Sequence, residues 1–176
     1  MENKIIYWSV VNFNIWIFYM AATNEGLCFV GSLNGEFTEL AEWAQKKLVQ
    51  CKLLQNDTLL QPYKEQFIEY FSGKRKSFTF PIEFHGTPFQ QSVWLELTKI
   101  PYGSTYSYSD IANFLQKPNS VRAVASAIGA NPVLITIPCH RVIGKNGKLT
   151  GFRGGLEMKE ELLKLENIHL SSTISC

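Results

Sequence analysis

The sequence predicts an α/β (α+β) protein: a small N-terminal α/β domain with a short antiparallel sheet, then a mainly helical C-terminal domain of winged helix-turn-helix type. Two observations support this prediction. Short β-branched and aromatic runs separated by turn residues dominate the start of the chain. After residue 86 the pattern changes to short helices with clear start and stop signals, followed by an Asn-Gly pair. A chain of 176 residues holds one domain or two small ones.

The first half contains the predicted sheet. Ile5–Val10, Ile15–Ala21 and Leu27–Val30 have the composition of three strands, with a Thr-Asn-Glu-Gly turn between the last two. Apolar residues then recur at helical spacing over Glu36–Gln50, and again over Tyr63–Phe71. No motif in this half carries chemistry, so we interpret it as a support domain.

The second half is punctuated by helix signals. Thr87-Pro88 is a cap residue followed by proline at the first helical position. Ser107 and Asp110 form an acidic relative of the capping box and open a helix over Tyr108–Gln116. After a Lys-Pro-Asn break, Ser120–Ile128 forms the next helix. Two short helices joined by a tight break are typical of a DNA-binding helix-turn-helix.

The second of these helices is rich in small residues. Ala123, Ala125, Ser126 and Ala127 allow close approach, either of another helix in the core or of a sugar-phosphate backbone. Core packing is the commoner reason for any one of them. Arg122, near the start of the helix, could enter a groove of DNA, although most single arginines are only solvated.

Charge is segregated along the chain, although the net charge is only +2. Residues 111–156 contain no Asp or Glu, and the remaining residues hold 17 − 6 = 11 basic against 15 acidic side chains. Six basic residues lie in the acid-free stretch: Lys117, Arg122, Arg141, Lys145, Lys148 and Arg153. A solvated basic loop region would look similar, but the complete absence of acids favours a surface that binds phosphate backbone.

A cysteine followed directly by a histidine lies at the centre of this basic stretch. Val133–Ile137 is predicted to be a buried strand or extended segment that leads through Pro138 to Cys139 and His140. Adjacent side chains of an extended segment point to opposite faces, so the pair needs a bridging water for the imidazole to take the thiol proton and leave a thiolate. The alternative is a cysteine that only fills the core.

The chain after Cys139 contains a predicted hairpin and a final helix. Asn-Gly at 146–147 predicts a hairpin with Val142–Ile143 and Leu149–Thr150 as its arms, forming a basic wing. Gly151–Gly155 is flexible backbone that permits close approach of a ligand. A helix over Leu156–Glu166 follows, and sequence alone leaves Glu166 either partly buried or, more commonly for such a residue, facing solvent.

Cysteine spacing and hydropathy exclude several classes of protein. None of the four cysteines forms a C-x-x-C pair, and a metal site from Cys28, Cys51 and His85 is only a weak alternative. The apolar stretch Ile5–Met20 is too short and too interrupted for a membrane span. No signal peptide is recognised, so we expect a cytoplasmic protein. We also expect no cofactor, no metal and no membrane partner.

An ordered series of motifs then identifies a family. The motifs are Gly86-Thr87-Pro88-Phe89, Val93-Trp94, Ile100-Pro101-Tyr102-Gly103, Ser107-Tyr108, Arg122-Ala123-Val124, Asn131-Pro132, Ile137-Pro138-Cys139-His140-Arg141-Val142, Gly154-Gly155-Leu156, Lys159 and Glu166. In this order they resemble the O6-alkylguanine-DNA alkyltransferases, also called methylated-DNA–protein-cysteine methyltransferases. The first half is similar only in size and pattern, as the ribonuclease-H-like α/β domain of that family.

The resemblance implies a role for each residue of a relay. Cys139 is implied as the alkyl acceptor, and His140 as a base that acts through a water. Glu166 is implied to hold the other ring nitrogen of the histidine, as in a catalytic triad. Tyr108 is implied to donate a hydrogen bond to the guanine, and Asn131 to tie the helix-turn-helix to the active-site segment.

The resemblance also implies how DNA is held. Arg122 is implied to fill the gap left by a flipped base, while the helix with Ala123 and Ser126 lies in the minor groove. Tyr108 and Arg141 complete the implied DNA-contacting set. The implied base pocket consists of Leu134, Val142, Phe152, Arg153 and Gly154, together with the carbonyls of Cys139 and Val142. Leu134 replaces a proline of some members, which leaves tolerance for bulky adducts open. Phe152 replaces a tyrosine of others, so any contact through that hydroxyl is absent.

We therefore predict single-use transfer of an alkyl group from guanine O6, with thymine O4 as a second candidate, in double-stranded DNA bound by a monomer. The predicted domains are residues 1–85 as support, 86–170 for DNA binding and alkyl transfer, and 171–176 as a tail. Three rivals remain: an alkyltransferase-like protein that binds lesions without chemistry, a winged-helix regulator with a structural cysteine, and a cysteine hydrolase. The acceptor cysteine argues against the first, and the adjacency of Cys139 and His140 argues against the last.

Overall fold

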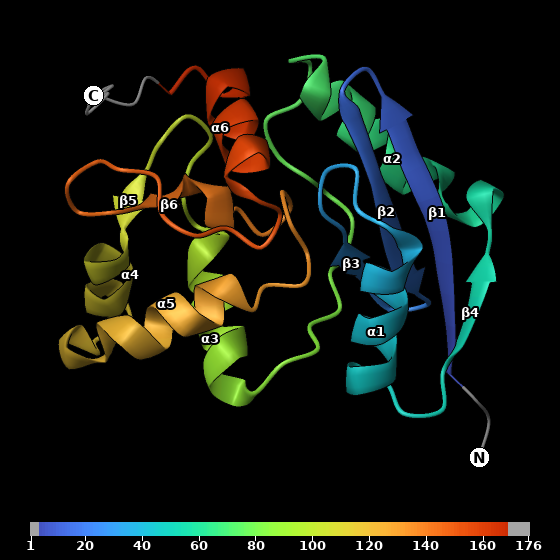
Figure 1. Cartoon of the computed structure of the whole chain (residues 1–176), viewed down its shortest axis with the longest axis horizontal. Helices are drawn as coiled ribbons and strands as arrows, with labels where there is room; N and C mark the ends of the chain where they lie inside the picture. The colour runs from blue at the N-terminus through green and yellow to red at the C-terminus, as the bar shows by residue number, and fades with distance from the viewer. Residues whose placement is uncertain (1–3, 169–176) are drawn as a thin grey trace. The chain divides into compact units, whose positions relative to one another are not determined.

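The computed structural model describes residues 4–168, which divide into two compact units (Figure 1). One unit comprises residues 4–87 together with 132–136, and the other comprises residues 88–131 and 137–168. Each unit has its own core and is described separately below.

The first unit is built on a four-stranded sheet of order β3-β2-β1-β4. β1 (Ile5–Phe13), β2 (Trp16–Thr23) and β3 (Gly26–Val30) run antiparallel through short turns, which confirms the three predicted strands. The fourth strand, β4 (Lys52–Gln55), was not predicted and pairs in parallel with β1. β1 and β2 account for the apolar stretch at the start of the chain, and no helix within residues 4–168 is long and apolar enough to cross a membrane.

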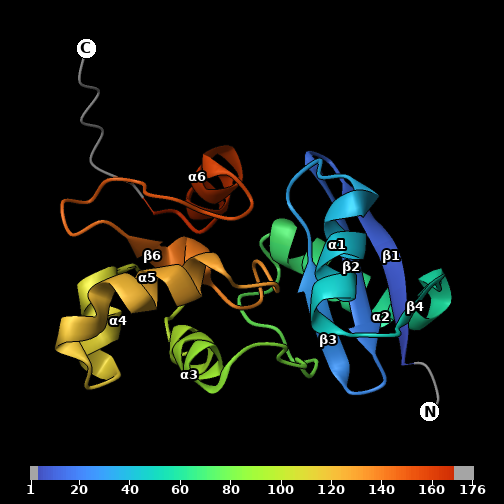
Figure 2. The same cartoon turned by 60° about the horizontal axis from the view of Figure 1, so that its bottom comes forward.

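Two helices cover opposite faces of this sheet, α1 (Phe37–Lys47) and α2 (Asp57–Phe71), as Figure 2 shows. Side chains of β2 alternate between them: Tyr19 contacts Phe37 of α1, whereas Trp16 stacks on Phe71 of α2 with ring centroids 4.4 Å apart. Because helices cover both faces of β2, its sequence from Trp16 to Ala22 is apolar rather than alternating with polar residues, although Ile17 is exposed.

The second unit is mainly helical. It contains α3 (Pro88–Leu97), α4 (Tyr108–Phe114), α5 (Val121–Gly129) and α6 (Leu156–Leu165). The predicted capping box is confirmed, since the Ser107 hydroxyl accepts from the Asp110 amide while the Asp110 carboxylate accepts from the Ser107 amide. Helix α3 packs on α5, and the indole of Trp94 donates to the Ala127 carbonyl at 2.8 Å.

The strand predicted over Val133–Ile137 is wrong. Only Val133 forms a β-bridge, and the residues that follow make a tight turn closed by a 2.8 Å hydrogen bond from the Thr136 amide to the Leu134 carbonyl. At its centre Ile135 adopts a φ of +71°, a rare conformation for a β-branched residue. The β-branched run reflects burial, because a buried turn needs the same apolar side chains as a buried strand.

The predicted hairpin is wrong in its pairing, although its turn forms. The Gly147 amide donates to Gly144 at 2.8 Å, and Gly147 has a φ of +77°. However, β6 (Val142–Ile143) pairs in parallel with β5 (Tyr106–Ser107) rather than with residues 149–150. Pairing with a segment far earlier in the chain cannot be anticipated from a local turn signal.

Candidate active site

Cys139 lies in a single turn of 3₁₀ helix, Cys139–Arg141, rather than in an extended segment. Pro138 leads into it with φ −79° and ψ 58°, an inverse γ-turn closed by the Cys139 amide on the Ile137 carbonyl at 2.7 Å. The expectation that Cys139 and His140 point to opposite faces of a strand therefore rests on the wrong conformation. The turn buries the cysteine, whose exposure is 3 %.

Asn131 is the hydrogen-bond donor to the cysteine sulfur. Its Nδ2 lies 3.1 Å from the Cys139 Sγ and 3.1 Å from the Ile137 carbonyl oxygen, so one amide group holds both the sulfur and the backbone before it. Asn131 directly follows the C-cap of α5, and thus connects the end of this helix to the cysteine turn. Burial raises the pKa of Cys139, and the Asn131 hydrogen bond only partly offsets this. The resting sulfur is therefore a neutral thiol.

His140 pairs with a buried glutamate. Its Nε2 lies 2.9 Å from the Glu166 Oε1, and neither side chain is exposed. The ring nitrogen that is bonded to a carboxylate carries the proton, so in the neutral imidazole Nδ1 is the unprotonated, basic nitrogen. Nδ1 is buried and has no hydrogen-bond partner within residues 4–168. Burial lowers the pKa of His140, partly offset by Glu166, so the resting imidazole is neutral and able to accept a proton.

Glu166 is surrounded by donors at the C-terminal end of α6. Arg141 donates to it from Nε at 2.9 Å and from Nη2 at 2.8 Å, and the Gly103 amide donates at 3.2 Å. Burial alone would raise the pKa of Glu166, but the hydrogen bonds from His140 and Arg141 outweigh it and hold that pKa far below its usual range. Glu166 is therefore an anion, and the solvent-facing alternative is excluded.

The position of Arg141 does not fit the DNA-contacting role that the resemblance implies. Arg141 is only 7 % exposed. Beyond Glu166, its guanidinium donates from Nη1 to the Ile100 carbonyl at 2.7 Å and lies 5.7 Å from the centre of the Tyr102 ring. Its donors are thus directed into the protein, and we reassign Arg141 to the support of Glu166.

Lys159 is a further buried charge that the sequence analysis left without a role. Its Nζ donates to the Val142 carbonyl at 2.6 Å and to the Thr150 carbonyl at 3.0 Å, and burial lowers its pKa to about 8. Lys159 and Glu166 occupy positions i and i+7 on the face of α6 that also carries Leu162 and Leu163. Charged residues at core spacing were the available signal for both.

The remaining residues of the predicted base pocket are placed as follows. Tyr108 is the first residue of α4 and half-buried, and its hydroxyl accepts from the Thr150 hydroxyl at 2.9 Å. Phe152, Arg153 and Gly154 are half-buried, and the Arg153 Nε donates to the Asn131 carbonyl at 2.8 Å. Leu134 is fully buried and belongs to the turn that is part of the first unit.

Both carbonyls predicted to meet the base already accept one hydrogen bond. The Val142 carbonyl accepts from Lys159, and the Cys139 carbonyl accepts from the Val142 amide. A carbonyl oxygen has a second lone pair, so a bond already accepted does not prevent a contact with the base.

Comparison with known proteins identifies the family. The model for the 6-O-methylguanine DNA methyltransferase DNA-binding domain matches residues 88–168, and the model for the ribonuclease-like domain of the same proteins matches residues 6–84. The chain belongs to the 6-O-methylguanine DNA methyltransferase family.

Individual members of this family are similar over most of the chain. The inducible methylated-DNA–protein-cysteine methyltransferase of Bacillus subtilis is 58 % identical over 92 % of this chain and 90 % of its own length. A methylated-DNA–protein-cysteine methyltransferase of Methanosarcina acetivorans is 40 % identical over 92 % of this chain and 98 % of its own. Among solved structures, Mycobacterium tuberculosis OGT in complex with DNA has a TM-score of 0.78 at 34 % identity, covering 91 % of this chain and 92 % of that one.

Some of the small residues of α5 are buried in the core of this family member, and others are exposed on its surface. Val124, Ala127 and Ile128 are buried, whereas Arg122, Ala123 and Ser126 are exposed. The question left open by the sequence is thus answered residue by residue: Ala127 packs in the core, and Ala123 and Ser126 form a surface that another molecule can approach closely.

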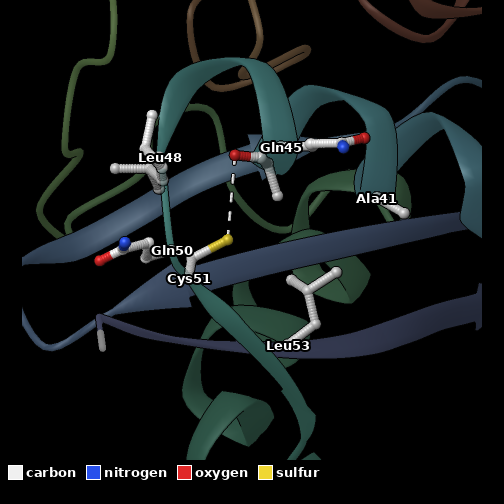
Figure 3. A pocket seen from close by; sticks show the side chains of 8 residues that line it. Ala41, Gln45, Leu48, Gln50, Cys51 and Leu53 are labelled. Atoms are coloured by element: carbon white, nitrogen blue, oxygen red, sulfur yellow. Dashed lines mark hydrogen bonds between the residues drawn. The ribbon is translucent and has the colours of Figure 1, made fainter. Parts of the chain in front are cut away.

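The first unit also has a pocket, of ≈ 500 Å³, between α1 and β4 (Figure 3). Apolar side chains and two glutamines line it, and the half-buried Cys51 donates its thiol to the Ala44 carbonyl at 3.8 Å. Within residues 4–168 no three His, Cys, Asp or Glu side chains are grouped to hold a metal ion, so Cys28, Cys51 and His85 do not form the site considered as an alternative. All three cysteines of the described range are free thiols.

Proposed function

We propose that Cys139 is the acceptor in a direct, irreversible transfer of an alkyl group from guanine O6 in DNA. The observation that carries this assignment is the arrangement at the buried turn: a cysteine held by Asn131, followed by a histidine whose Nε2 is bonded to Glu166 and whose Nδ1 has no hydrogen-bond partner in the described part of the chain. Family membership supplies the reaction, and these contacts supply the residues. Thymine O4 is the second candidate substrate.

The transfer is an in-line displacement. The Cys139 sulfur forms a bond to the alkyl carbon while the bond from that carbon to O6 breaks, and its electron pair stays with the guanine. The thiol proton passes through a water to His140 Nδ1 and later returns to water, from which the guanine takes up the proton that it gains. The Tyr108 hydroxyl donates a hydrogen bond to the guanine as negative charge builds up on the base. That hydroxyl accepts its contact from Thr150, which leaves its own hydrogen available for the base.

Three groups stabilise the charges that develop: Glu166, Asn131 and Lys159. Glu166, an anion at rest, stabilises the imidazolium that forms on His140. The Asn131 amide donates to the sulfur as it becomes negative, and the charge of Lys159 acts in the same direction. Fixed donors of this kind act most strongly in a buried site from which water is excluded.

The substrate base must leave the duplex to reach this sulfur, because an alkyl group within the stack is not accessible. We propose that α5 lies in the minor groove, where the small exposed side chains of Ala123 and Ser126 allow the DNA backbone to approach closely. Arg122 would fill the gap that the flipped base leaves in the duplex. The partner is thus double-stranded DNA bound by one copy of the chain. We place the reaction in the cytoplasm, where cysteine thiols stay reduced.

A thioether is not readily cleaved, so each molecule acts once. Incubation with a duplex carrying radiolabelled O6-methylguanine should transfer one methyl group per protein molecule, all of it to the peptide containing Cys139. Cys139→Ala should transfer none, whereas the matched variants Cys28→Ala and Cys51→Ala should transfer as the wild type does. Repair that continues while the Cys139 peptide stays unmodified would refute the assignment. Tight binding with the methyl group left on the DNA would instead indicate a lesion-binding protein.

A further inference from the structure

His140 and Arg141 both contact Glu166, but unequally. His140 contacts it through one nitrogen, Nε2 at 2.9 Å. Arg141 contacts it through two nitrogens, with Nη2 on the same oxygen as the histidine and Nε on the other. The guanidinium is fixed in place, since its third nitrogen donates to the Ile100 carbonyl at 2.7 Å. A paired, two-pronged contact of this kind is the stronger of the two.

We propose that Arg141 is a positioning residue that keeps Cys139 latent: by holding Glu166 it limits the basicity of His140, so that the acceptor remains a neutral thiol until an alkylated base is bound. This inference rests on the proposed function of Cys139 and adds a means of regulating the same site.

The charges around His140 support this role. One anion, Glu166, favours the imidazolium, while two cations, Arg141 and Lys159, oppose it. The neighbouring Cys139 is uncharged at rest, and Tyr102 lies against the guanidinium of Arg141. His140 itself is fully buried, which also disfavours its charged form. If Arg141 were absent, Glu166 would still accept the bonds from His140 and the Gly103 amide that favour its charged form, and one of the two cations that oppose the imidazolium would be gone.

A latent acceptor has a clear advantage for a single-use protein. The thiolate, not the thiol, reacts with free electrophiles and oxidants, and a cysteine consumed in that way is lost for repair. A neutral thiol beside a neutral imidazole reacts slowly with such reagents. The proton then leaves the sulfur only as the bond to the substrate carbon forms.

The test measures the reactivity of Cys139 without DNA. Full-length protein is treated with iodoacetamide across a range of pH, and labelling of the Cys139 peptide is followed by mass spectrometry. The sulfur bonds to the reagent carbon, iodide leaves and the thiol proton goes to the buffer. Arg141→Gln, which keeps a donor for the Ile100 carbonyl but loses the charge, should lower the midpoint of the profile and raise labelling at pH 7 about tenfold, the effect of one pKa unit. Arg141→Lys keeps the charge but loses the two-pronged contact, so its midpoint should fall between those of wild type and Arg141→Gln.

Two further variants separate charge tuning from loss of structure. Glu166→Gln should raise the midpoint, and adding Arg141→Gln to it should produce a much smaller shift than Arg141→Gln alone. Unmodified duplex binding at wild-type affinity identifies variants whose second unit is folded, and Arg141→Met replaces Arg141→Gln if the latter fails this criterion.

The possible results are distinct. An unchanged or raised midpoint in a folded Arg141→Gln or Arg141→Met variant would overturn the inference, while methyl transfer from DNA to Cys139 in the wild type would still support the proposed function. Absence of that transfer would overturn the proposed function itself.

Discussion

The two units bury different kinds of side chain. Within residues 4–168, the buried polar side chains of the first unit are the hydroxyls of Ser9 and Thr23, and its other buried side chains are aliphatic, aromatic or sulfur-containing. The second unit buries five polar or charged side chains: Asn131, His140, Arg141, Lys159 and Glu166. Buried charges cost several kcal/mol each unless paired, roughly by the penalty for removing an ion from water. The buried side chains of the first unit therefore mainly stabilise the fold, whereas those of the second unit include charged groups whose burial costs stability and provides the groups needed for chemistry.

Two buried cysteines show the same contrast at the level of one atom. Cys28, in the first unit, donates its thiol to the Ala21 carbonyl at 3.4 Å, which favours the protonated form. Cys139, in the second unit, accepts from Asn131 at 3.1 Å, which favours the thiolate. Burial raises the pKa of both thiols, but only at Cys139 does a neighbouring side chain act in the opposite direction through a hydrogen bond. Burial makes a cysteine inert, and the direction of its hydrogen bond decides whether it can be activated.

The largest expected effect is on the stability of the first unit. Phe71→Ala removes a ring that stacks on Trp16 and should lower the free energy of unfolding by about 3–5 kcal/mol, the usual cost of truncating a buried aromatic residue. Urea unfolding followed by tryptophan fluorescence measures this loss. At a temperature where the variant remains folded, the rate constant of methyl transfer should equal that of wild type. A lower transfer rate constant in the folded variant would show that the first unit contributes to the reaction as well as to stability.

Next in size is the effect of Glu166→Gln on chemistry. Without the carboxylate the imidazolium loses its stabilising anion, and the single-turnover rate constant should fall about 100-fold, or about 2.7 kcal/mol in barrier. The matched control is Glu83→Gln in the first unit, where the carboxylate accepts from Lys4 and Thr23 and should leave the rate unchanged. Rapid-quench measurement on methylated duplex distinguishes the two. Equal rates in both variants would remove Glu166 from the relay.

Alkylation of Cys139 should destabilise the second unit. A methyl group added at a fully packed position costs about 1–3 kcal/mol. The sulfur also becomes a thioether, a weaker acceptor for the Asn131 amide. Thermal unfolding before and after reaction with methylated duplex measures the change, with Cys139→Ala treated in parallel to control for bound DNA. Equal melting temperatures of the wild type before and after reaction would contradict the prediction.

The smallest expected effect is the pH dependence caused by Lys159. Burial lowers its pKa from 10.5 to about 8, so between these values the unfolded chain holds a proton that the folded protein has released. Stability conferred by this residue must therefore rise with pH through that window, by about 1 kcal/mol or less per pH unit. Urea unfolding at pH 8 and pH 10 should show this gain for wild type and for Lys117→Met, an exposed control, relative to Lys159→Met. If the folded protein kept Lys159 protonated throughout this pH range, the wild type would show no such gain in stability.

Local patterns predicted the helices and much of the sheet, and they failed where a distant segment decides the outcome. The capping box at Ser107 and Asp110 is a signal within four residues, and the helix starts where predicted. β4 is four residues long with no alternation, and it forms because β1 offers a free edge. Val142–Ile143 pairs with a strand more than thirty residues earlier, so the Asn-Gly turn beside it could not reveal its partner.

The site was predicted through its motifs, and the physical roles of two residues were not. Cys139 and His140 were recognisable as a pair, but their conformation depends on the turn at Pro138 rather than on a strand. Arg141 looked like a phosphate-binding arginine because five other basic residues share its acid-free stretch. Its burial follows from Glu166, 25 residues later, which no local pattern connects to it.

The position of Tyr108 makes the orientation of its side chain depend on the helix cap before it. As the first residue of α4 it stands where helices usually fray, yet Ser107 and Asp110 on either side of it lock that turn through reciprocal bonds. Loss of such a cap costs about 1 kcal/mol, little for the whole fold but enough to let the first turn open. If Tyr108 donates to the substrate base as proposed, Ser107 and Asp110 fix the direction of its hydroxyl without themselves belonging to the proposed site.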